Sequence, residues 1–176
     1  MHNHGSWLVK NSITTTTDVT IVGVPIDGHM IEEAERLAAE VPLLRHSIRK
    51  GEGTVYGFLG ELVFLRIVGG LHENTYDYDV VMRSGVRVDV KTKMATSAPR
   101  PHYECSVAAA NTKQGCDVYA FVRVMKDMTQ GWYCGAMFKD LFFAEARPIK
   151  KGDLDESNGW VASADCFNVR IDALTY

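Results

Sequence analysis

The sequence predicts a single α/β domain in which a mixed central sheet is flanked by helices. A chain of 176 residues is long enough for one hydrophobic core and too short for two typical ones. Residues 54–70 form an apolar segment of helical length, and residues 116–125 form the continuous apolar run typical of a strand buried on both faces. Between them, residues 76–93 alternate in the manner of a β-hairpin. Together these three features indicate the α/β class.

Composition narrows the classes of function. Hydrophobic residues make up 46% and charged residues 23% of the chain, the balance of a folded globular protein. The formal net charge of −3 excludes the strongly basic class of DNA-coating proteins, so any phosphate binding must be local. The four cysteines lack CxxC spacing and are expected to be reduced. Because no apolar stretch approaches ~18 residues and the chain starts without a signal-peptide pattern, we expect a cytoplasmic protein without a membrane partner.

The other segments are predicted from local patterns. Residues 1–28 favour an arm or an edge strand, and Asp27 has the position of an N-cap for the helix that follows. A group that we call the basic cluster precedes the apolar helix and consists of Arg45, His46, Arg49 and Lys50. After the hairpin we expect two strands, a short helix and a terminal strand, at residues 102–109, 131–138, 139–146 and 165–174.

The hairpin carries more charge than a core element normally does. Alternate residues of a strand share a face. One face of the second strand is made of valines, namely Val86, Val88 and Val90. The other face is charged, and its members are Arg87, Asp89, Lys91 and Lys93. Such a face needs an explanation other than packing.

The turn of the hairpin decides whether its acids meet. A three-residue loop at 83–85, with its glycine in the left-handed conformation, places Asp79 opposite Asp89. The same register places Asp77 opposite Lys91. A two-residue Ser-Gly loop would instead direct one acid into the core, and burial of an unpaired carboxylate costs several kcal/mol. The three-residue loop is therefore predicted.

Two carboxylates that face each other across neighbouring strands repel unless a positive charge lies between them. Oxygen ligands suit hard cations, so we predict Mg²⁺, with Mn²⁺ as a substitute, at Asp79 and Asp89. Lys91 shares their face and is able to orient or deprotonate a water, or to neutralise charge on a reacting phosphate. Asp77 shares the face of Asp79 and stays an alternative ligand. These residues outline a site for phosphodiester hydrolysis.

This arrangement resembles that of a known family. Asp79, nine intervening residues and then Asp89-Val90-Lys91 follow a helix that contains Gly60-Glu61, which is similar to the pattern of the PD-(D/E)XK nuclease superfamily. The resemblance covers roughly residues 53–125. It implies a restriction-endonuclease-like αβββαβ core, with residues 126–176 as a C-terminal extension of that core.

The resemblance also implies a role for each matching residue. Asp79 would bridge the metal, Asp89 would be the second ligand, and Val90 would contribute its backbone carbonyl. Glu61 matches the acid of the first core helix, and Lys91 matches the catalytic lysine. The chain departs from the pattern in three ways. No proline precedes Asp79, the second acid is aspartate rather than glutamate, and the segment for the second core helix is short.

The implied function is that of a Mg²⁺-dependent DNA nuclease, of the endonuclease type, that leaves 5′-phosphate and 3′-hydroxyl ends. The residues expected to contact DNA are Arg87, Lys93, Arg100, Lys113 and Gln114. Two alternatives stay open. One is a DNA-binding or assembly module of the same fold that does not cleave, and the other is a junction or repair nuclease that acts as a homodimer. The sequence also leaves open the preferred DNA structure, the number of metal ions and the pathway.

Overall fold

The structure is a computed structural model that describes residues 21–40, 52–155 and 160–175. The basic cluster lies outside these ranges, as do residues 1–20 of the predicted arm.

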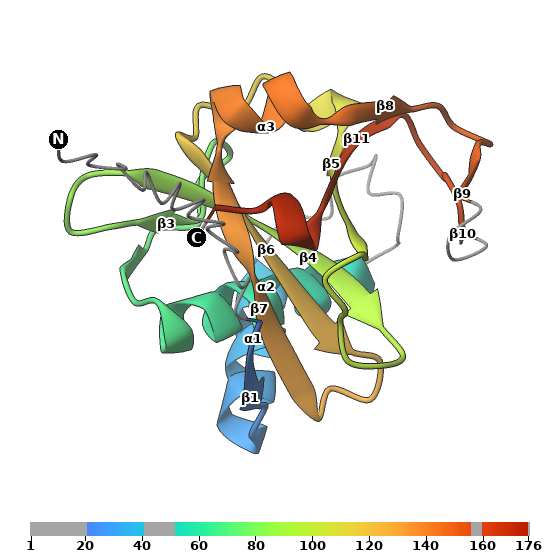
Figure 1. Cartoon of the computed structure of the whole chain (residues 1–176). Coiled ribbons are helices and arrows are strands. Elements are labelled where there is room, and N and C mark those ends of the chain that lie inside the picture. Colours follow the sequence, from blue (N-terminus) through green and yellow to red (C-terminus); the bar gives the residue numbers. More distant parts are fainter. Residues whose placement is uncertain (1–20, 41–51, 156–159, 176) are drawn as a thin grey trace, which may run out of the picture.

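A six-stranded mixed sheet forms the centre of the protein (Figure 1). Its strands are β1 (Val22–Pro25), β2 (Leu71–His72), β3 (Val80–Val81), β4 (Arg87–Ala95), β6 (Val118–Met125) and β7 (Gln130–Phe138). They lie side by side in the order β1-β7-β6-β4-β3-β2. β4 and β6 are parallel, and the other neighbouring strands are antiparallel. The expected mixed sheet is confirmed, and β1 is the edge strand predicted within residues 1–28.

Helix α2 (Glu52–Ile67) packs on one face of this sheet, and helix α1 (Gly28–Glu40) packs on α2. Asp27 caps α1 as predicted, because its Oδ1 accepts a hydrogen bond from the Met30 backbone N–H at 3.0 Å. Its Oδ2 accepts a hydrogen bond from Arg66 Nη1 at 2.9 Å and so joins the start of α1 to the end of α2. In α2, Leu59 and Val63 are fully buried against the valines of β4 and β6.

The opposite face is covered by a second sheet and by helix α3 (Lys139–Glu145). This sheet has the order β5-β11-β8 and consists of β5 (Glu104–Ala108), β11 (Cys166–Arg170) and β8 (Arg147–Ile149). A separate pair is formed by β9 (Leu154–Asp155) and β10 (Trp160–Val161). Val107, Tyr119 and Phe142 are fully buried between the layers, and the four cysteines are buried free thiols.

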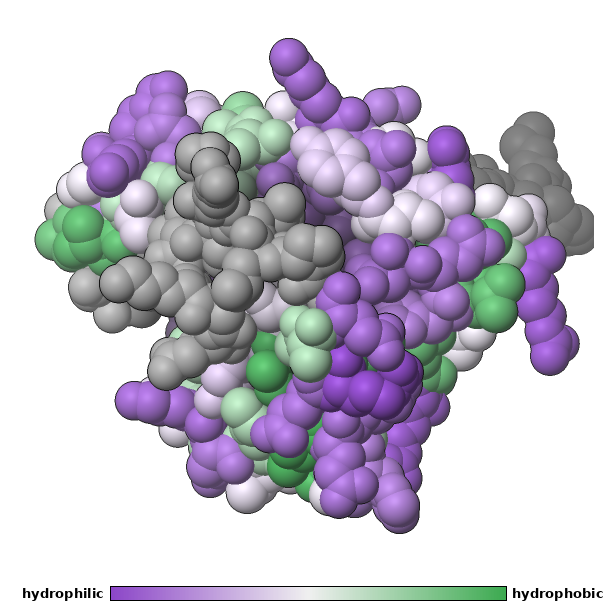
Figure 2. Space-filling view, turned by 180° about the vertical axis from the view of Figure 1, so that it is seen from behind, coloured by the Kyte–Doolittle hydropathy of each residue, from purple (hydrophilic) through white to green (hydrophobic). Residues whose placement is uncertain are grey.

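The surface seen in Figure 2 is mostly hydrophilic over the described residues, and hydrophobic side chains there form only small groups. On α1, Arg36 lies between Glu33 and Glu40 and pairs with both, at 2.7 and 2.5 Å. Such pairs at helical spacing are typical of a solvated helix face. Within the described part of the chain, no helix is long and apolar enough to cross a membrane.

The third strand of the predicted core was placed wrongly. Residues 102–109 do form a strand, β5, but it belongs to the second sheet. The strand that completes the central sheet is β2, which directly follows the two glycines at the end of α2 and has only two residues. Between β5 and β6 the short segment forms a single 3₁₀ turn, Ala109–Asn111, in place of a helix.

The three-residue hairpin loop is confirmed. Met82 N–H donates to the Val86 carbonyl at 2.9 Å, and Gly85 has a φ of 84°, which is the left-handed region. Val80 then lies opposite Val88, the register that brings Asp79 toward Asp89.

The register does not continue to Asp77, so the predicted pairing of Asp77 with Lys91 is wrong. β3 begins only at Val80. Before it, the Thr75 hydroxyl donates to the Tyr78 carbonyl at 2.7 Å and bends the chain away from β4. Asp77 is exposed, and its Oδ1 accepts a hydrogen bond from the Gly115 backbone N–H at 2.9 Å.

Gly60 allows α2 to approach β4 closely at the position next to Glu61. An ideal Cβ on Gly60 would lie 1.8 Å from Thr92 Oγ1, far inside van der Waals contact. Gly57, one turn earlier in the same helix, has no atom within 4 Å of the corresponding position. The glycine of the Gly60-Glu61 pair therefore sets the distance between the helix and the strand that carries Asp89.

We predict that Gly60→Ala lowers the free energy of unfolding by about 1–3 kcal/mol, because the added methyl group overpacks the contact with Thr92. Gly57→Ala is the matched control and should raise it by up to about 1 kcal/mol through helix propensity. Urea denaturation of both variants measures the difference. Equal stability of the two variants would contradict the close approach.

Candidate functional site

Three acidic side chains from different elements gather at one end of β4. Asp89 lies in β4 and is only 3% exposed, Glu61 lies in α2 and is 7% exposed, and Asp79 directly precedes β3. Burial is the largest cause that raises the pKa of Asp79, and together with the nearby carboxylates of Glu61 and Asp89 it brings this pKa to about 8. Burial also raises the pKa of Glu61. We call these three residues the acid cluster.

Asp79 is held by the backbone of β4. Its Oδ2 accepts a hydrogen bond from the Val90 N–H at 2.7 Å. A side-chain oxygen thus replaces the backbone carbonyl that would accept this bond if the pairing of β3 and β4 continued. The N–H and C=O of one strand residue point to the same side of the strand. The Val90 carbonyl therefore points toward the Asp79 side of β4, as a backbone ligand of the same site must.

Lys91 lies beside the acid cluster and has two polar partners. Its Nζ is 2.5 Å from Asp89 Oδ2 and 3.0 Å from Gln114 Oε1. The Gln114 side chain in turn donates to the Tyr76 carbonyl at 3.0 Å, which fixes its orientation. Lys91 Nζ also lies 5.9 Å from the centre of the Tyr119 ring. The ammonium group is thus positioned from several sides.

His72 is a site residue that the sequence did not indicate. Its Nε2 lies 2.6 Å from Glu61 Oε2, and its ring makes an edge contact with Phe58 at 6.4 Å between ring centres. This hydrogen bond opposes the effect of burial on the pKa of Glu61. The one sequence signal was the acid within an apolar helix, which requires a partner. The partner itself lies in β2, a strand too short to be predicted.

The acid cluster has the oxygen donors that a hard divalent cation prefers. The Asp89 Oδ2 atom is buried without a hydrogen-bond partner, because its contact with Lys91 lacks hydrogen-bond geometry. A buried carboxylate oxygen in this state needs a further positive partner. In the described ranges, no group of three or more His, Cys, Asp or Glu side chains is placed so that it could hold a metal ion by itself. Asp79 and Asp89 provide the two carboxylates, Val90 a carbonyl and Glu61 a third acid, which is an oxygen-only donor set.

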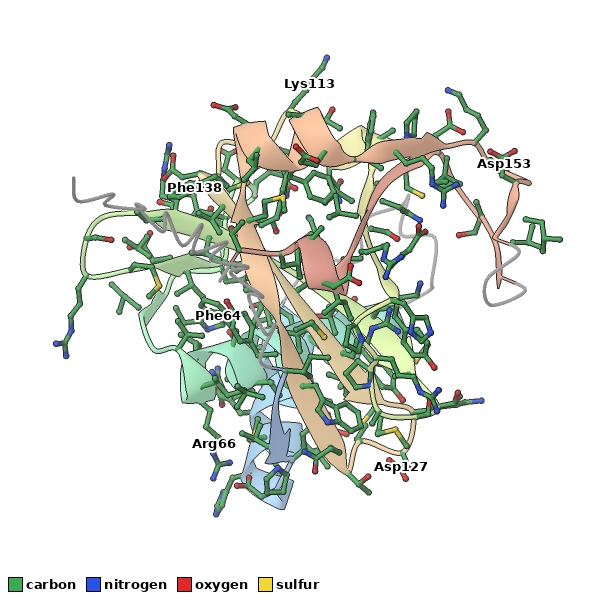
Figure 3. All side chains as sticks on the ribbon, viewed as in Figure 1. Phe64, Arg66, Lys113, Asp127, Phe138 and Asp153 are labelled. Carbon is green, nitrogen blue, oxygen red and sulfur yellow. The ribbon has the colours of Figure 1, made fainter. Side chains whose placement is uncertain are left out.

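The five residues predicted to contact DNA do not lie in one place. Gln114 reaches the site through Lys91, and Lys93 lies two residues further along the same face of β4. Arg87 is held by Asp117, at 3.0 Å from Nε to Oδ2 and 2.8 Å from Nη2 to Oδ1. Arg100 and Lys113 are exposed, and Figure 3 shows Lys113 pointing outward beyond α3.

Comparison with known proteins adds no relative. No model of a known protein family matches the chain, and no curated protein is significantly similar to it. Functional conclusions therefore depend on the site itself.

We predict that the Arg87–Asp117 pair contributes to stability in a pH-dependent way. Its hydrogen bonds with Arg87 lower the pKa of Asp117 to about 2. Because the unfolded value is ~3.9, the contribution is complete above about pH 5 and is lost as the pH falls toward the folded value. Asp117→Asn should cost at most about 1 kcal/mol near neutral pH, since the pair is partly exposed.

Urea denaturation of wild type and Asp117→Asn across this pH range measures the effect. The stability difference should shrink as the pH drops below about 5. A difference that stays constant would show that Arg87 is not held by an ionised Asp117.

Proposed function

We propose that this protein is a metal-dependent DNA nuclease of the PD-(D/E)XK type, which hydrolyses phosphodiester bonds and acts as an endonuclease. The observation that carries the proposal is the contact of Lys91 with Asp89, in a buried cluster where Asp79 and Glu61 are also held. Acids buried together with one lysine are costly to a fold and are typical of catalytic sites.

The order of elements supports the same type of core. α2 is followed by β2, β3 and β4, which lie side by side, and then by β6, which is parallel to β4. This corresponds to the helix, three strands and final strand of an αβββαβ core. The connection before the last strand differs, because it contains β5 and a 3₁₀ turn instead of a second helix.

The residues of the acid cluster would hold one or two Mg²⁺ ions. Asp79 and Asp89 would bind through carboxylates and Val90 through its carbonyl, with Glu61 as the further acid. When bound, a divalent cation supplies charge stabilisation for the reacting phosphate and lowers the pKa of a coordinated water. His72 holds Oε2 of Glu61 in a hydrogen bond and so would orient the carboxylate, which leaves Oε1 as the oxygen for the metal.

The position of Lys91 supports a role as the residue that assists the attacking water. Its ammonium group contacts Asp89 and is steadied by Gln114, so it is able to orient a water at that carboxylate. It also adds positive charge where negative charge develops on the phosphate. The same contact offsets part of the cost of burying the acids when no substrate is bound.

We predict that wild type nicks or linearises supercoiled plasmid with Mg²⁺ or Mn²⁺ and not with EDTA. Lys91→Ala should lower the rate by at least about 100-fold, because it removes the group that orients the water. Lys126→Ala, an exposed lysine beyond the end of β6, is the control and should retain the wild-type rate. Equal loss of activity in both variants, or cleavage by wild type in EDTA, would contradict the assignment.

A second prediction separates metal binding from chemistry. In titration calorimetry, Asp89→Asn should abolish Mn²⁺ binding because the cluster loses its central carboxylate. Lys91→Ala should bind Mn²⁺ at least as tightly as wild type, because a cation that competes for Asp89 is removed. Wild-type Mn²⁺ affinity in Asp89→Asn, with native circular dichroism, would place the metal elsewhere.

A further inference from the structure

A cavity of about 150 Å³ lies between the two sheets, directly beyond Lys91. Its polar lining includes Lys91, Lys93, Glu104, Ser106, Arg123 and Ser163. A second hollow of about 250 Å³ shares two of these residues, Lys93 and Arg123. The first cavity alone has several times the volume that one water needs. The face of β4 that carries Asp89 and Lys91 thus continues into a basic, hollow region.

Arg123 is the unusual residue of this cavity. It lies in β6 and is only 8% exposed. Among the described residues, its contacts are the Glu104 carbonyl at 2.9 Å, the Tyr103 ring at 5.2 Å and the Cys134 thiol. None of these is a carboxylate, and Arg123 Nε is buried without a hydrogen-bond partner. A buried guanidinium in this state needs an anion.

Two further polar groups lie close to Arg123. Lys93 is its direct partner in the parallel register of β4 and β6, so two basic residues lie next to each other on one face. The Ser106 hydroxyl is also buried without a hydrogen-bond partner. Glu104 does not supply the missing anion, because its carboxylate oxygens accept hydrogen bonds from Arg147 at 2.8 Å and Asn168 at 2.7 Å.

We propose that Arg123, Lys93 and Ser106 bind a phosphate of the substrate strand next to the phosphate that is cleaved, an assignment that rests on the proposed nuclease function. An arginine and a hydroxyl are suited to the oxygens of a tetrahedral phosphate. Lys93 lies two residues beyond Lys91 along β4, a rise of about 6.6 Å. This is comparable with the distance between successive phosphates of a nucleic-acid strand.

The test measures the kinetics of wild type and Arg123→Gln on two substrates. An oligodeoxynucleotide has flanking phosphates, whereas bis(p-nitrophenyl) phosphate has one phosphodiester and none beside it. We expect Arg123→Gln to raise KM for the oligodeoxynucleotide at least about tenfold. Its kcat/KM for bis(p-nitrophenyl) phosphate should stay within about twofold of wild type. Arg123→Lys should recover part of the loss because it keeps the charge, and Arg83→Gln, at the exposed hairpin tip, is the control.

Equal loss on both substrates would overturn the assignment, because Arg123 would then act on the fold or on the cleaved phosphate. Ser106→Ala provides a milder variant should Arg123→Gln not fold, and it should raise KM for the oligodeoxynucleotide alone. An unchanged KM in Ser106→Ala and Arg123→Lys would also overturn it.

Inorganic phosphate separates this proposal from the nuclease function. If wild type cleaves neither substrate, the nuclease proposal fails, and a phosphate-dependent rise in Tm still tests the cavity. That rise should occur in wild type and be absent in Arg123→Gln and Ser106→Ala. An equal rise in all three proteins would contradict a phosphate site here. A rise confined to wild type, together with an unchanged KM for the oligodeoxynucleotide, would assign the cavity to free phosphate instead.

Discussion

The hydrogen bond from the Val90 backbone to the Asp79 carboxylate is the interaction on which the site depends. It takes the place of the next backbone hydrogen bond between β3 and β4 and holds a carboxylate beside Asp89. The cost of this arrangement is visible in Asp79, whose pKa rises to about 8 through burial and the neighbouring acids. A protein that buries acids in this way needs positive charge beside them, and Lys91 supplies only part of it.

The parallel pair of β4 and β6 arranges charge in sequence along one face. Asp89 lies next to Tyr119, then Lys91 next to Phe121, and then Lys93 next to Arg123. The acidic end fits a cation, and the basic end fits an anion. A net charge of −3 is compatible with a polyanionic substrate when attraction is this local. Under the proposed function, the strand pair would hold the metal at one end and a phosphate of the substrate at the other.

The hairpin was predictable because its chemistry is local. Alternation at a period of two and the position of Gly85 determined the register of Asp79 and Asp89, and the structure has that register. Asp77 was predicted wrongly because a turn formed by the Thr75 hydroxyl ends the strand early. Arg87 belongs to an ion pair with Asp117, a partner thirty residues away that no local pattern reveals.

Features that depend on residues far apart in the chain could not be predicted, because no local pattern reveals such contacts. β2 has two residues, so neither it nor His72 gives a periodic signal. Arg123 lies within an apolar run, and only the register of β4 and β6 brings it to Lys93. The glycine before Glu61 was noted as part of a motif, but its physical role is the contact with Thr92.

Anomalous diffraction from crystals soaked in Mn²⁺ tests the central claim most directly. The account predicts a peak at coordination distance from the carboxylates of Asp79 and Asp89 and from the Val90 carbonyl, with the Lys91 ammonium displaced from Asp89 Oδ2. A crystal that binds Mn²⁺ only elsewhere, with Lys91 still in contact with Asp89, would contradict a metal site in the acid cluster.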